Sequence, residues 1–152
     1  MDSTEPSSAV AWLAAAAPDP EACRREWERS TLGLALLPAG RLWDVLIVPA
    51  RLGLPALRLL DRLPGPGPAL LDPGDDTAGF LVPVGTVDRW IGTGVRGAGE
   101  GTWVVVPHPG RRGRGLRWLA PPDGSGRLVD PIALELALHE AAATLGGPGE
   151  HL

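Results

Sequence analysis

Short apolar runs separated by proline and glycine recur along the chain, and this pattern predicts short strands and helices. Residues 32–37 and 43–48 are two such runs with a brief Pro-Ala-Gly turn between them, which favours two adjacent strands. Neither run alternates apolar with polar residues, so both strands are expected to be covered on both faces of a sheet. Two further strands are predicted at residues 69–71 and 79–84.

Helical periodicity is clearest over residues 50–63, where leucine and alanine recur three and four positions apart. The apolar face of that helix should lie on the sheet. A helical turn is predicted over residues 86–91. A C-terminal helix is predicted to begin after Asp130, which is followed by proline, and to end near residue 145.

The first thirty residues predict two more helices. Ser8 is placed to cap a helix over residues 9–17, which stops before Pro18. Asp19 and the proline after it are a typical N-cap and first-turn pair for a helix over residues 21–30. The first helix has the length of a signal-peptide core, but no lysine or arginine precedes it, so we expect a cytoplasmic protein.

Residues 94–119 are predicted to form a β-hairpin with a long loop. Residues 102–106 are β-branched and aromatic, and residues 115–119 alternate apolar with polar side chains, so both suit strands. Prolines and glycines between them stop either strand from continuing. The loop and its second arm carry the most concentrated positive charge of the chain, at Arg111, Arg112, Arg114 and Arg117.

Together these elements predict a single α/β domain over residues 8–145, between flexible tails at residues 1–7 and 146–152. A length of 152 residues suits one domain. Its centre is expected to be a mostly antiparallel, mixed sheet of five to seven strands covered by helices. The six tryptophans are expected to anchor its core.

Composition and charge narrow the possible functions. The net charge of −4 excludes a protein that coats nucleic acid with its whole surface. Cys23 is the only cysteine, which excludes an intrachain disulfide. No apolar run reaches the roughly 18 residues of a membrane span. His139 and Glu140 begin a zinc-protease pattern, but Ala143 stands where the second histidine would be, so we predict no metal site there.

The residue order from the predicted hairpin to residue 123 resembles the closing part of a known domain. This is the N-terminal domain of bifunctional DNA primase/polymerases, the prim-pol branch of the archaeo-eukaryotic primase superfamily. In that family an Asp-hydrophobic-Arg motif is followed by glycines and by a strand that ends in prolines. A basic loop comes next, and then a second strand that ends in a pair similar to Trp-Leu. The corresponding residues here are Val95 and Arg96, residues 101–107, residues 111–117, and Trp118 with Leu119. The resemblance covers residues 32–123 and implies an RRM-like primase/polymerase core.

The resemblance also implies a two-metal site for nucleotidyl transfer, and this sequence departs from it. Family members carry two acids on one strand, a histidine on the next strand and a third acid before the Gly-rich strand. Asp44 stands in the place of the first acid, but Leu46 and Gly94 stand in the places of the other two. Residues 80–84 contain no histidine. One carboxylate cannot hold two divalent ions in the geometry that phosphoryl transfer requires.

We therefore predict an inactive relative without a cofactor. Mg²⁺ would be required only if an enzyme remained, with other acids in the missing places. The candidates for those places are Asp75, Asp76 and Asp88.

Two functions from different classes are consistent with the sequence. The first is a nucleic-acid- or nucleotide-associated module in DNA replication that binds single strands without polymerising them. Its phosphate-facing set would be Arg96, His108, Arg111, Arg112, Arg114 and Arg117. The second is a protein-interaction or regulatory domain that kept the fold and pairs with another protein or with itself. In that case the arginine-rich loop is a solvated surface loop. Neither function requires a membrane.

Overall fold

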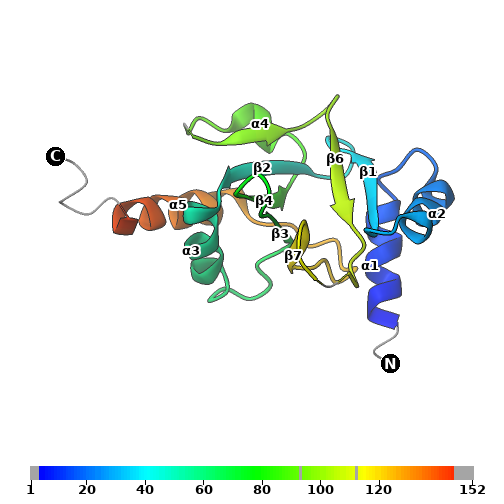
Figure 1. Ribbon diagram of the computed structural model, residues 1–152. Helices are drawn as coiled ribbons and strands as arrows, with labels where there is room; N and C mark the ends of the chain where they lie inside the picture. Colours follow the sequence, from blue (N-terminus) through cyan, green and yellow to red (C-terminus); the bar gives the residue numbers. More distant parts are fainter. Residues whose placement is uncertain (1–3, 93, 112, 146–152) are drawn as a thin grey trace.

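The computed structural model describes residues 4–92, 94–111 and 113–145 (Figure 1). The helices of this part are α1 (Thr4–Ala14), α2 (Pro20–Arg29), α3 (Ala50–Leu60), α4 (Thr86–Arg89) and α5 (Pro131–Leu145). The strands are β1 (Leu34–Pro38), β2 (Asp44–Pro49), β3 (Ala69–Asp72), β4 (Thr77–Val82), β5 (Arg96–Ala98), β6 (Trp103–Pro107) and β7 (Arg117–Ala120). The fold is mixed α/β, as predicted.

Five strands form one antiparallel sheet in the order β5-β2-β4-β3-β7. Its first four strands along the chain, with α3 after β2 and the short α4 after β4, follow one another as β-α-β-β-α-β. This is the succession of the split βαβ unit. β7 extends the unit along the outer edge of β3. The predicted antiparallel sheet is confirmed, with five strands. β1 and β6 form a separate two-stranded sheet, which we term the β1–β6 ribbon.

Both faces of the five-stranded sheet are covered (Figure 1). On one face, α3 and α5 enclose a core that contains Leu46 and Phe80. On the other face, the β1–β6 ribbon with α1 and α2 encloses a core that contains Val45 and Leu81. Neighbouring residues of β2 therefore enter different cores, because side chains alternate along a strand. The predicted two-sided burial of residues 43–48 is confirmed.

The predicted hairpin over residues 94–119 is wrong. β6 pairs with β1, where Leu36 is opposite Val105, whereas β7 pairs with β3 in the other sheet. The two segments approach each other at their ends, where the Nε1 of Trp118 donates to the carbonyl of Pro107 at 2.8 Å. Each segment packs an apolar face into the core beside a partner that is distant in sequence. Local alternation cannot specify which partner that is.

The predicted pairing of residues 32–37 with residues 43–48 is also wrong, because β1 and β2 lie in different sheets. Between them, Gly40 has a positive φ of 89°, and its N–H donates to the carbonyl of Trp43 at 2.8 Å. A Cβ on Gly40 would lie 2.4 Å from the Cα of Glu100, so the turn packs directly on the loop before β6. This tight turn leads the chain from the ribbon into the main sheet.

Capping residues mark the starts of α2 and α5, as predicted. The Oδ1 of Asp19 accepts a hydrogen bond from the N–H of Ala22 at 3.2 Å. The Oδ2 of Asp130 accepts one from the N–H of Ala133 at 3.1 Å. α5 ends at Leu145, also as predicted. These contacts span three residues, so the local sequence determines them.

Three helices differ from their predicted bounds, among them α4, which ends at Arg89 and not at residue 91. α1 begins at Thr4, so Ser8 lies inside this helix instead of capping it, and the predicted tail is partly helical. Pro6 falls in the first turn of α1, where a missing backbone N–H is tolerated. α3 ends at Leu60, before the predicted end at residue 63. The other residues of the predicted tails, 1–3 and 146–152, lie outside the described residues.

Gly53 lets α3 pack closely on β4, and a substitution tests this contact. A Cβ at Gly53 would lie 2.5 Å from the Cβ of Ala78 and 3.0 Å from the Cγ2 of Val48. We expect Gly53→Val to lower the free energy of unfolding by about 2 kcal/mol, because overpacking would push α3 away from the sheet. Urea denaturation measures this change.

Gly74→Ala is the control for this experiment. A Cβ at Gly74 would meet only the Oδ1 of Asp72 at 3.5 Å, which is ordinary contact. The control should change the free energy of unfolding by less than about 0.5 kcal/mol. An equal decrease in the free energy of unfolding in the two variants would contradict close packing of α3 on β4.

Candidate functional site

Asp44, the acid that the sequence resemblance would make a metal ligand, begins β2 and is 2% exposed. Its Oδ2 accepts hydrogen bonds from the N–H of Gly85 at 2.9 Å and from the N–H of Val87 at 3.1 Å. A Cβ on Gly99 would lie 3.7 Å from its Oδ1. The two backbone N–H groups that share one carboxyl oxygen hold the start of α4 against the first residue of β2.

The second position on the same face of β2 is apolar. Leu46 follows Asp44 by two residues, so the two side chains point to the same side of the strand. Leu46 is 1% exposed and belongs to the core that contains Phe80 and Val82. Divalent ions need oxygen ligands and retain water, and this close-packed apolar core supplies neither.

The acids considered as substitutes do not gather at Asp44. Thr77 is opposite Pro49 in the sheet, so the turn that contains Asp75 and Asp76 lies at the far end of β2. The length of β2 separates that turn from Asp44 by about 17 Å, at about 3.4 Å per residue. Asp88, the remaining candidate, is exposed on α4.

The loop between β6 and β7 is braced by one of its own arginines. The Nε of Arg111 donates to the carbonyl of Leu32. Its Nη1 donates to the carbonyls of Arg114 at 3.2 Å and Leu116 at 2.9 Å. The guanidinium of Arg111 therefore ties the loop to the segment that enters β1. Within the described ranges, no carboxylate forms an ion pair with Arg111.

His108 packs beside this brace. Its Nδ1 accepts a hydrogen bond from the N–H of Gly110 at 2.9 Å, and its ring meets Trp27 edge-on with centroids 5.8 Å apart. A neutral ring with an accepting Nδ1 carries its proton on Nε2. Desolvation by burial lowers the pKa of His108 from its ordinary 6.5. At neutral pH the side chain therefore offers a hydrogen-bond donor and no charge.

A shallow recess of about 380 Å³ opens between the end of α2 and this loop. Its lining includes Ser30, Thr31, His108 and Arg111. These side chains offer two hydroxyl groups, an imidazole N–H and a guanidinium, and no carboxylate is among the described residues of the lining. Such a set of donors suits an anionic group such as a phosphate.

The remaining arginines of the predicted set are dispersed. Arg96 lies on β5 and Arg117 lies on β7, at opposite edges of the five-stranded sheet. Four strand spacings separate these edges by about 19 Å, at about 4.8 Å each. The Nη2 of Arg96 also pairs with the Oδ2 of Asp75 at 2.6 Å. Arg114 is exposed on the loop, and Arg112 lies outside the described residues.

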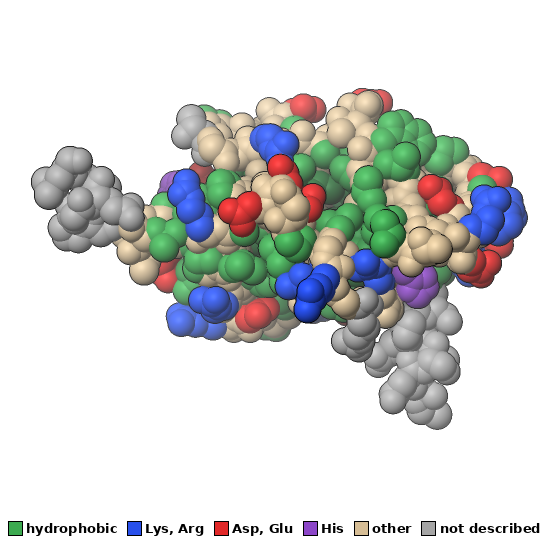
Figure 2. Space-filling view, in the orientation of Figure 1, with side chains coloured by type: hydrophobic (Ala, Val, Ile, Leu, Met, Phe, Trp, Pro, Cys, Tyr) green, Lys and Arg blue, Asp and Glu red, His purple; other side chains and the backbone are tan. Residues whose placement is uncertain are grey.

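Sequence reasoning missed the outer face of the β1–β6 ribbon. Leu36 is 49% exposed, Trp103 is 54% exposed and Val105 is 44% exposed. Figure 2 shows hydrophobic side chains gathered over β1 and β6. The expectation that residues 32–37 are covered on both faces is wrong, because only the inner face of β1 enters the core. Trp103 is likewise an exception among the tryptophans. The uniformly apolar run of β1 resembles that of β2, so no local signal marked this exposure.

No known protein family, curated protein or solved structure matches this chain. Among the described residues, no helix combines the length and the apolar character needed to cross a membrane. Across residues 4–92, 94–111 and 113–145, no group of three His, Cys, Asp or Glu side chains is placed to hold a metal ion.

Substitution of Asp44 tests its structural role. We expect Asp44→Ala to lower the free energy of unfolding by about 3 kcal/mol, because the N–H groups of Gly85 and Val87 lose their buried acceptor. Asp44→Asn keeps one acceptor oxygen and should lower the free energy of unfolding by a smaller amount. Urea denaturation measures both variants. Asp88→Ala, at an exposed position on the same turn, is the control. An Asp44→Ala variant as stable as the wild type would overturn the structural role.

The pH dependence of stability tests the burial of His108. Because its pKa is lowered in the folded chain, the unfolded chain binds a proton more readily. The stability that depends on the neutral ring is fully present above the ordinary pKa of 6.5 and is lost as the pH falls towards the lowered value. The stability advantage of the wild type over His108→Asn should therefore shrink between about pH 7.5 and about pH 5.

Chemical denaturation at several pH values measures this difference. His139→Asn, at an exposed position on α5, is the matched control for replacing a histidine with asparagine. A difference for His108→Asn that stays constant over the same range would show that His108 is not held in its neutral form.

Proposed function

We propose that this chain is a catalytically inactive relative of the prim-pol domain and binds single-stranded nucleic acid through its arginine loop. The arginine loop is defined as residues 108–117. The order of residues 32–123 and the split βαβ succession of the core support the relationship. The setting implied by this relationship is DNA replication in the cytoplasm.

The brace formed by Arg111 is the observation that carries the proposal. Three main-chain carbonyls orient its guanidinium, and none of the described ion pairs neutralises it. A side chain that is already ordered loses little rotamer freedom when it binds a phosphate. The hydroxyl groups and the imidazole N–H of the adjacent recess add donors for the same phosphate.

Arg114 and Arg117 extend the positive charge along the loop and into β7. Contacts from arginine to phosphate position a strand without reading its bases, so the binding would be independent of sequence. Three such contacts give a slope of about −2 for the logarithm of the binding constant against the logarithm of the salt concentration. Arg96 is not included, because it lies at the opposite edge of the sheet and is paired with Asp75.

The surroundings of Asp44 support the absence of catalysis. Its Oδ2 receives two backbone N–H groups, and the position that would supply a second ligand is Leu46 in the core. A carboxylate held in this way serves the fold. Phosphoryl transfer would require at least one further acid beside it.

Fluorescence anisotropy with a labelled single strand tests the proposed function. At low salt we expect the wild type to bind weakly. Arg114→Ala combined with Arg117→Ala should weaken binding by about tenfold or more and reduce the steepness of the salt dependence by about two thirds. Arg111 is left in place because its loss would also release the loop.

Arg51→Ala combined with Arg58→Ala is the matched control. These arginines are exposed on α3, and the variant has the same net charge as the test variant. Binding by the control should equal that of the wild type. Equal weakening in both variants would show that net charge alone attracts the strand, and no binding by the wild type at low salt would refute the proposal.

A protein-interaction domain is the alternative function. The exposed apolar side chains of the β1–β6 ribbon favour it, because a solvent-facing sheet normally alternates apolar with polar residues. This alternative predicts no affinity for nucleic acid at low salt together with association through the ribbon.

A further inference from the structure

We propose that the outer face of the β1–β6 ribbon is a homodimer surface, occupied by the same face of a second copy of this chain. The inference develops the alternative function and rests on the exposed apolar side chains of the ribbon. It does not require nucleic-acid binding, so the two proposals can fail independently.

The two faces of the ribbon differ in what covers them. The inner face, with Ala35, Leu37 and Val106, is buried in the core beneath α1 and α2. The outer face has Leu36 directly opposite Val105. These outward side chains are apolar as well, so the ribbon is hydrophobic on both sides and only one side is covered by the described residues.

The size of the exposed surface suits a weak dimer. Trp103 is 54% exposed, Leu36 is 49% exposed and Val105 is 44% exposed. Leu32, just before β1, is 57% exposed. Side chains of this size and exposure form an apolar patch of roughly 400 Å², which is large enough to mark an interaction site on a small protein. Two such patches with their polar rims reach the lower range of specific interfaces, about 1,200 Å² in total.

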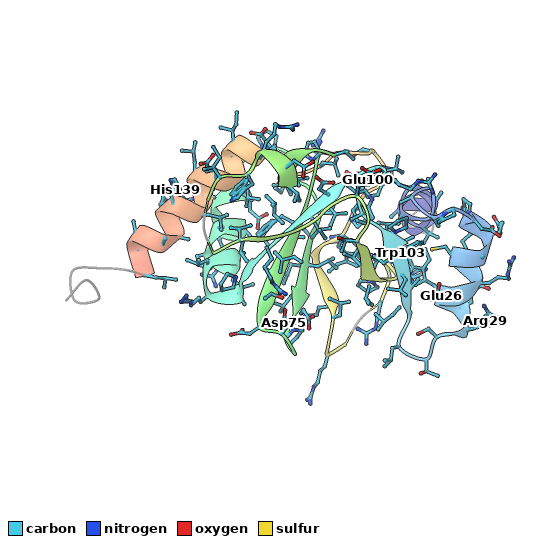
Figure 3. The ribbon with its side chains drawn as sticks, turned by 90° about the horizontal axis from the view of Figure 1, so that it is seen from above. Glu26, Arg29, Asp75, Glu100, Trp103 and His139 are labelled. Atoms are coloured by element: carbon cyan, nitrogen blue, oxygen red, sulfur yellow. The ribbon has the colours of Figure 1, made fainter. Side chains whose placement is uncertain are left out.

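The charges at the two ends of the ribbon favour a second copy over an unrelated partner. Glu100 is exposed beside the Trp103 end, and Figure 3 labels both side chains in that part of the molecule. Arg111 lies at the other end, where its Nε donates to the carbonyl of Leu32. The ribbon therefore has an acidic end and a basic end.

A twofold axis that crosses the strands reverses one ribbon relative to the other. Glu100 of one copy is then placed over the Arg111 end of its partner, and the reverse contact occurs at the other end. The same patch therefore supplies complementary apolar surface and complementary charge on both sides of the interface. A nucleic-acid strand along this face would instead meet the carboxylate of Glu100 beside Trp103.

Sedimentation velocity of the full chain over the micromolar concentration range tests the proposal. The wild type should change from its monomer mass of 15.9 kDa to twice that mass, with a Kd on the order of 10 µM. Trp103→Glu should raise the Kd at least about tenfold, because it places a charge in the apolar centre of the interface. Leu36→Lys, on the neighbouring strand, should have the same effect and serves as the second variant if Trp103→Glu fails to fold.

The charge arrangement has its own variant. Glu100→Arg should raise the Kd about threefold or more, because it brings like charges together at both ends of the interface. An unchanged Kd for this variant would overturn the antiparallel arrangement.

Two further variants test whether the chain dimerises through the ribbon or through another surface. Ile132→Glu replaces an exposed apolar residue of α5, 69% exposed, and should dimerise like the wild type. Arg114→Ala combined with Arg117→Ala should also dimerise like the wild type, whatever its effect on nucleic-acid binding. A wild-type chain that stays monomeric throughout would overturn the proposal. Dimerisation that Ile132→Glu abolishes and Trp103→Glu leaves intact would do the same.

Discussion

Burial of β2 on both of its faces organises the two cores of this protein. Successive residues of this strand enter the core beneath α3 and α5 and the core beneath the β1–β6 ribbon in turn. β2 also pairs with β4 on one side and β5 on the other, so its backbone and side chains are enclosed. Close-packed interiors admit few voids, and a polar reaction centre would have to displace one of these cores.

Asp44 is the polar exception at the start of this strand, and its surroundings show how the fold satisfies a buried carboxyl group. Main-chain N–H groups from the β4–α4 turn satisfy its Oδ2. A buried carboxylate is stable when it is hydrogen-bonded, and losing its partners would cost several kcal/mol. Two-metal phosphoryl transfer at this position would require a second acid, where the chain has Leu46. Our functional proposals concern the arginine loop, which runs into β7 at the edge of the main sheet, and the outer face of the ribbon.

Prediction from the sequence succeeded where a contact spans few residues. Asp19 and Asp130 cap helices through hydrogen bonds three residues along the chain, and the periodicity of residues 50–63 identified α3. The pairing of β6 with β1 was missed, because an apolar sequence does not indicate which other strand it pairs with. The brace formed by Arg111 was missed for the same reason, because Leu32 lies 79 residues away. Within the candidate site, the sequence shows which arginines are present but not the hydrogen bonds that hold them.

A Mn²⁺ titration of the ¹⁵N-labelled protein, followed by NMR, tests whether Asp44 serves the fold and binds no catalytic metal. Paramagnetic broadening reports metal ions close to individual amides. We predict that the amide signals of Gly85 and Val87 stay sharp throughout, because these groups occupy the Oδ2 of Asp44. Selective and saturable broadening of these two signals, with template-directed primer synthesis that Asp44→Ala abolishes, would contradict the account.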